Sequence, residues 1–97
     1  MRMVKHIVMF KLKDKTPDNV DSLVNALEGM VGKIDSLRFL EVGRDFKESE
    51  RSFDVVLTTH FDDREGLESY ARHPVHQPVI QLAREICHPT VVVDYEI

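Results

Sequence analysis

Several features are scarce in this 97-residue chain, and each scarcity excludes a class of protein. A single cysteine, Cys87, excludes an internal disulfide and is typical of a reducing compartment. No apolar run approaches the roughly 20 residues of a membrane-spanning helix, and the first residues do not resemble a secretory signal. A net charge of −4 provides no overall positive field for nucleic acid or anionic lipid. We therefore expect a cytoplasmic protein that binds neither nucleic acid nor a membrane.

Metal-binding motifs are scarce as well. The chain has no HExxH, no CxxC and no dense acidic cluster, although His73 and His76 are imidazoles of the kind that bind metals. We expect no metal and no cofactor. His73 precedes Pro74, so its expected role is to end a helix, and Cys87 is expected to be a buried structural thiol.

Strand and helix patterns alternate along the chain and predict one domain over residues 1–97. Apolar, β-branched segments predict strands at 3–12, 37–44, 52–61 and 90–97. Apolar residues spaced three and four apart predict a long helix from Thr16 to about Ile34. A second helical region follows Asp63, broken in two at Pro74 and ended by Pro89. This order predicts an α+β, ferredoxin-like β-α-β-β-α-β protomer, with an antiparallel sheet and helices on one face.

Both faces of the predicted sheet carry apolar residues. Val4, Val8 and Phe10 share one face of the first strand with His6, whereas Ile7 and Met9 lie on the other. Helices cover only one face, and an exposed apolar face is rarely tolerated by a monomer. The pattern therefore predicts a homodimer in which two sheets pack against each other.

The segment from Tyr70 to His76 carries the strongest chemical signal. Tyr70, His73 and His76 recur every third residue, and Pro74 interrupts the run. A histidine can exchange protons near neutral pH, and a tyrosine hydroxyl can donate a hydrogen bond to a substrate oxygen. Acid–base catalysis by His76 and Tyr70 is one hypothesis. The alternative is structural, with the Tyr70 ring in the core and His76 at a helix start.

Several motifs occur in an order that resembles one known family. They are the segments 4–11, 27–34, 41–45, 73–76 (His-Pro-Val-His) and 92–95. Together they resemble the stress-responsive dimeric A/B barrel (Dabb) family over essentially the whole chain. The resemblance implies a ferredoxin-like protomer whose sheet pairs with that of its partner in a dimeric α/β barrel.

The resemblance also implies roles for individual residues. One branch of the family, similar to the plant olivetolic acid cyclase, performs an intramolecular aldol condensation. There, a histidine of the His-Pro-x-His motif is the base, and a tyrosine six residues earlier assists. These positions are His76 and Tyr70 here, and His6 matches a further histidine of the pocket. The cyclase has another histidine on its third strand, where Val55 stands in this chain.

The expected site is a mainly apolar small-molecule cavity between sheet and helices. His76 and Tyr70 are its candidate catalytic residues, and its candidate substrate-binding residues are His6, Val8, Phe10 and Val55. The leading hypothesis is cofactor-free acid–base chemistry, cyclase- or isomerase-like, on an aromatic or polyketide-like compound. The alternative is a stress-response or ligand-binding homodimer without enzymatic activity, in which the pocket histidine is structural.

Overall fold

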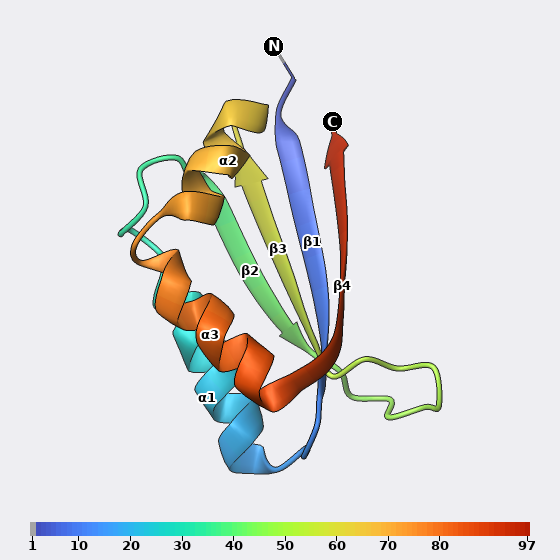
Figure 1. Ribbon diagram of the computed structural model, residues 1–97. Coiled ribbons are helices and arrows are strands. Elements are labelled where there is room, and N and C mark those ends of the chain that lie inside the picture. Colours follow the sequence, from blue (N-terminus) through green and yellow to red (C-terminus); the bar gives the residue numbers. More distant parts are fainter. Residues whose placement is uncertain (1) are drawn as a thin grey trace.

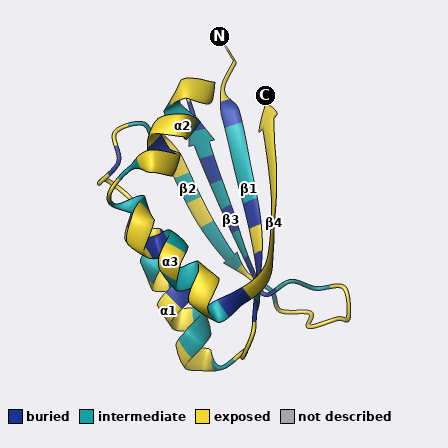
Figure 2. Ribbon diagram, viewed as in Figure 1, coloured by how far each residue is buried: buried dark blue, intermediate teal, exposed yellow. Residues whose placement is uncertain are grey.

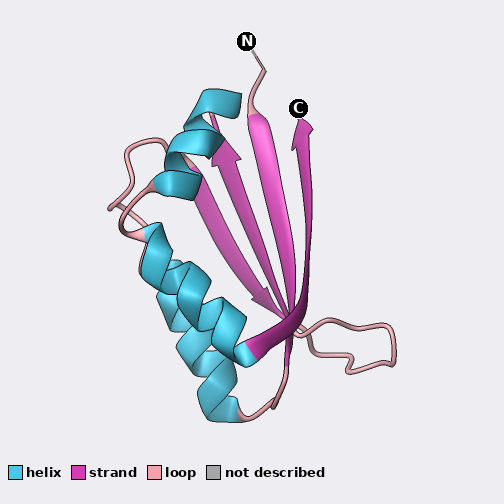
Figure 3. Ribbon diagram, viewed as in Figure 1, coloured by secondary structure: helices cyan, strands magenta, loops and turns pink. Residues whose placement is uncertain are grey.

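A four-stranded antiparallel sheet forms one layer of the protein, and three helices form the other (Figures 1 and 3). The computed structural model describes residues 2–97. The elements follow in the order β1 (Val4–Leu12), α1 (Pro17–Glu28), β2 (Phe39–Arg44), β3 (Val55–Phe61), α2 (Arg64–Arg72), α3 (His76–Ile86) and β4 (Cys87–Glu96). The strand order β2-β3-β1-β4, with all neighbours antiparallel, confirms the predicted ferredoxin-like protomer.

The core lies between the sheet and the helices. The inward residues of β1 and β3 pack against the apolar side of α1, which contributes Leu23, Val24 and Leu27. Val8 pairs with Leu57, so both strands place apolar side chains on this face, as the alternation of residues predicted. No helix among residues 2–97 is long and apolar enough to cross a bilayer.

The first helix is shorter than predicted. It begins as expected, with the Thr16 side chain accepting a hydrogen bond from the Asn19 N–H, but it ends at Glu28. Turns follow, and Gly32 has a φ of 79°, a left-handed conformation that favours glycine. Met30 and Ile34 are still buried beyond the helix end. The spacing of Met30 and Ile34 therefore indicates that both side chains are buried, not that they lie in a helix. The prediction that the helix ends near residue 34 was wrong.

Two strand boundaries differ from the prediction by three residues. The third strand begins at Val55 rather than residue 52, because the chain bends at Asp54, whose carboxylate accepts the Leu12 N–H. The last strand begins at Cys87, three residues before the predicted start. Cys87 has an extended backbone and pairs with Leu12, so pairing with β1 ends α3 at Ile86, ahead of Pro89.

The sheet face away from the helices is apolar and uncovered. The most exposed of its large side chains belong to β1, β2 and β4: Met9 (43%), Phe39 (42%), Val91 (45%), Val93 (60%) and Tyr95 (40%). Figure 2 shows β4 exposed along almost its entire length. We refer to this surface, defined by these five residues, as the outer face.

Candidate functional site

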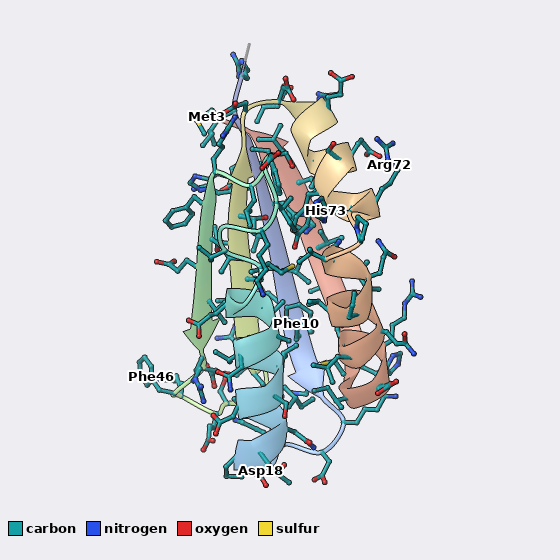
Figure 4. All side chains as sticks on the ribbon, turned by 90° about the vertical axis from the view of Figure 1, so that its left-hand side faces the viewer. Met3, Phe10, Asp18, Phe46, Arg72 and His73 are labelled. Atoms are coloured by element: carbon teal, nitrogen blue, oxygen red, sulfur yellow. The ribbon has the colours of Figure 1, made fainter. Side chains whose placement is uncertain are left out.

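The site begins at the break between α2 and α3. Asp63 caps α2 by accepting the Gly66 N–H, and the helix ends at Arg72. His73 has φ −64° and ψ 137°, an extended conformation favoured before proline. Its ring Nδ1 accepts the Val75 N–H at 3.1 Å, so His73 shapes the junction between the helices (Figure 4). This contact supports the structural role expected for it.

The break brings Tyr70 and His76 into direct contact. Their rings stack with centroids 4.1 Å apart and an interplanar angle of 28°. The other side chains around Tyr70 include Phe61, whose ring centroid is 5.0 Å away. Tyr70 is only 1% exposed, and its buried hydroxyl has no hydrogen-bond partner among residues 2–97. The two candidate catalytic residues are therefore neighbours, joined by stacking rather than by a hydrogen bond.

His6 joins this pair from β1. Its ring lies 6.0 Å from that of Tyr70, edge to face. Strand pairing places His6 opposite Asp94 of β4, and the Asp94 carboxylate accepts a hydrogen bond from His6 Nδ1. The carboxylate thus fixes the orientation and tautomer of this ring. Sequence reasoning missed the role of Asp94; only the register between the first and last strands could have revealed it.

A cavity of about 460 Å³ connects these residues, a size typical of small-molecule sites. It lies between the inner face of β1, the start of β4 and helix α3. Figure 4 looks onto the helix layer and shows Phe10 between α1 and α3. The residues that line the cavity are His6, Val8, Phe10, Lys13, Leu27, Leu57, Tyr70, His76, Val79, Ile80, Ala83, Arg84, Cys87, His88 and Thr90. Five of the six predicted site residues therefore line one cavity.

The sixth, Val55, lies outside the lining of this cavity. It is the first residue of β3, pairs with Phe10 and is 2% exposed in the core. Leu57, two residues further along the same face, reaches the cavity instead. His60 lies on the opposite face of the sheet, and its ring centroid is 4.6 Å from that of Phe39.

Burial sets the protonation states at the site. It lowers the pKa of His76 below 6.5, opposed by the hydrogen bond to the Ala71 carbonyl at 3.4 Å. A carbonyl only accepts, so His76 Nδ1 carries the proton and Nε2 keeps a free lone pair. Burial raises the pKa of Tyr70 far above 10, so its hydroxyl stays a neutral donor. The pair combines a base with a hydrogen-bond donor.

Neither a thiol nucleophile nor a cluster of metal ligands is formed here. Burial raises the pKa of Cys87 to about 11, so its thiol stays protonated at neutral pH and is a weak nucleophile. Within residues 2–97, no three histidine, cysteine or acidic side chains are arranged to hold a metal ion. The polar side chains that line the cavity can transfer protons and form hydrogen bonds.

A four-stranded antiparallel sheet with a broken helix over a histidine-lined cavity defines a ferredoxin-like A/B barrel protomer. The stress responsive A/B barrel domain family matches residues 4–97, and the chain belongs to this family. This confirms the resemblance seen in the sequence.

Known relatives agree with this assignment. An uncharacterised protein of Streptomyces coelicolor is 33% identical, over 97% of this chain and 99% of its own length. A stress-response A/B barrel domain-containing protein of Arabidopsis thaliana is 28% identical, over 96% of this chain and 85% of its own. Among solved structures, a dimeric ferredoxin-like protein of unknown function from Bacteroides fragilis aligns with a TM-score of 0.86. It is 34% identical, and the alignment covers 98% of this chain and 96% of that one.

The unpartnered Tyr70 hydroxyl yields a prediction about stability. A buried hydroxyl without a partner costs free energy, so Tyr70→Phe is expected to raise the free energy of unfolding by about 1 kcal/mol. Chemical denaturation measures this change. Tyr95→Phe is the matched control, because Tyr95 is 40% exposed and its substitution should leave stability unchanged. A loss of stability on Tyr70→Phe would show that the hydroxyl is satisfied in the folded protein.

The lowered pKa of His76 yields a second prediction. In an NMR titration its ring is expected to titrate below 6.5, with the signal assigned by its loss in His76→Gln. The unfolded chain then binds the proton first as the pH falls. The His76 contribution therefore reduces the free energy of unfolding from about pH 6.5 down to the folded pKa. A midpoint at or above 6.5 would contradict the buried environment described for this ring.

Proposed function

We propose that the cavity binds an apolar small molecule, aromatic or polyketide-like, and supports cofactor-free proton transfer on it. The observation that carries this proposal is the shared lining: His6, Tyr70 and His76 face the same apolar space. Ligand sites are commonly apolar clefts with a few converging polar groups. Because the lining is mostly aliphatic and aromatic, the body of the ligand is expected to be apolar.

Each polar residue has a role in this proposal. His76 Nε2 abstracts a proton from the carbon next to a carbonyl group. The Tyr70 hydroxyl, which has no partner within the described chain, donates to the enolate oxygen as negative charge develops. His6, oriented by Asp94, provides a second polar contact for the ligand. The same two positions serve as base and assistant in the cyclase that the sequence resembles.

One observation favours ligand binding without catalysis as the second candidate. The rings of Tyr70 and His76 stack, and no hydrogen bond links the Tyr70 hydroxyl to an imidazole nitrogen. A hydrogen bond between the two side chains would hold the base in position for proton transfer, and the stacked rings lack this support. In this alternative, the stacked rings form an apolar wall, and the protein acts in the stress response by holding its ligand.

Hydrogen–deuterium exchange on a ketone distinguishes the two candidates. 1-Tetralone, an aromatic ketone, is incubated with the protein in D₂O, and deuterium incorporation next to its carbonyl is followed by mass spectrometry. The wild type is expected to accelerate exchange over buffer, and His76→Gln to reduce that acceleration at least about 100-fold. His73→Asn is the matched control, since His73 lies outside the cavity lining and an asparagine side-chain oxygen can accept the Val75 N–H in place of Nδ1. Binding of 1-tetralone without accelerated exchange would support the binding protein instead.

We also propose that the chain is a homodimer held together by the outer face. The exposed side chains of this face form an apolar surface on β1, β2 and β4 that no element of residues 2–97 covers. The Bacteroides fragilis relative, at 34% identity, is described as dimeric, which supports the same assembly here.

A cytoplasmic location stays a prediction, resting on the single reduced cysteine.

Two adjacent valines test the dimer. Val93 is 60% exposed and pairs with Ile7 on the outer face, whereas Val92 is 54% exposed and pairs with Val8 on the helix side. Val93→Glu is expected to shift the sedimentation coefficient to that of a monomer, because it buries an unpaired charge at the interface. Val92→Glu should remain dimeric. A monomeric wild type at micromolar concentration, or a dimeric Val93→Glu, would contradict the proposal.

A further inference from the structure

Every residue that lines the cavity with a permanent charge is a cation. Lys13 and Arg84 contribute ammonium and guanidinium groups, and the imidazole of His88 lies in the same lining. No aspartate or glutamate lines the cavity, although the chain has 17 acidic and only 13 basic residues. The cavity therefore has an electrostatic character opposite to that of the protein as a whole.

The two cations lie at the far end of the cavity from the acid–base residues. His76 is the first residue of α3, and Arg84 lies in its last turn. Eight residues of helix span about 12 Å. Lys13 directly follows β1 and reaches the same end of α3, where its Nζ donates to the Arg84 carbonyl at 3.3 Å. A ligand that contacts both ends must therefore be elongated.

Neither cation is paired with a carboxylate. Within residues 2–97, ion pairs engage four other lysine and arginine side chains, those of Lys15, Arg38, Arg44 and Arg64. Neither Lys13 nor Arg84 takes part in any of them. The Arg84 guanidinium keeps its full set of donors, and Lys13 uses one of three. Both groups are available to an anion that enters the cavity.

We infer that the ligand is an elongated apolar molecule with an oxyanion at one end, a carboxylate or a phosphate. The oxyanion binds between Lys13 and Arg84, and the apolar body lies along α3 against Val79, Ile80 and Ala83. This arrangement directs the opposite end of the molecule toward His76 and Tyr70. The inference rests on the proposed function for the role of that end, and adds to it the charge and shape of the ligand.

Three probes of similar shape test this inference by isothermal titration calorimetry. They are 2-naphthylacetate, its neutral amide 2-naphthylacetamide, and 2-naphthyl phosphate. The wild type is expected to bind the acetate or the phosphate about five- to tenfold more tightly than the amide, since charge-assisted hydrogen bonds exceed neutral ones. The tighter of the two anions identifies the oxyanion. Rising ionic strength should reduce the preference, because exposed charges are screened.

A double substitution tests whether Lys13 and Arg84 cause the preference for an anion over the amide. Lys13→Gln with Arg84→Gln is expected to abolish the difference between anion and amide while leaving the affinity for the amide unchanged. Lys47→Gln with Arg51→Gln removes the same charges from the loop between β2 and β3, outside the lining, and should retain the preference. If Lys13 only capped the end of α3, its loss would lower stability without changing the ratio of affinities.

The outcomes separate the inference from the proposed function. Equal affinity of the wild type for anion and amide, with both bound, would overturn the inference and leave the apolar cavity intact. A preference that survives the Lys13 and Arg84 substitutions, or that ionic strength does not reduce, would also overturn it. Failure of all three probes to bind would contradict the ligand-binding cavity itself, and the inference with it.

Discussion

Proline at position 74 prevents one continuous helix from following β3, and the candidate site depends on that interruption. The residue before it, His73, is extended, so α2 stops at Arg72 and α3 starts at His76 in a new direction. Tyr70 and His76 then meet ring to ring, a contact that six-residue spacing on a straight helix would not give. The same redirection carries α3 along the sheet, where its apolar side forms a wall of the cavity.

The two faces of the sheet differ in what they pack against. The inner faces of β1 and β3 pack under the helices and form the core, but β4 extends past the helix layer and stays exposed. The space left between α3, β1 and the beginning of β4 is the cavity. The outer face carries the apolar side chains that the proposed dimer would bury. A chain of this size gains from such burial, because a small domain removes a modest share of its surface from water.

Periodicity in the sequence was sufficient to predict the architecture, since strand alternation and helical spacing report which side chains are buried. It placed the end of α1 too late, because Met30 and Ile34 keep the helical spacing while lying in the turns that follow. For the site, the local pair Tyr70 and His76 was predictable from the motif. Leu57 and Asp94 were not, because their positions depend on strand register, which no short motif encodes. The cationic end of the cavity likewise joins residues 71 positions apart in the chain.

We expect an apolar carbonyl compound to bind in the cavity beside His76 and Tyr70, and a crystal structure of the protein with bound 1-tetralone would test this. In that structure the ring system of the ligand is expected against Phe10 and Val79, with its carbonyl oxygen within hydrogen-bond distance of the Tyr70 hydroxyl. A ligand bound elsewhere, or a cavity filled by the side chains that line it, would show that the cavity is not the ligand site.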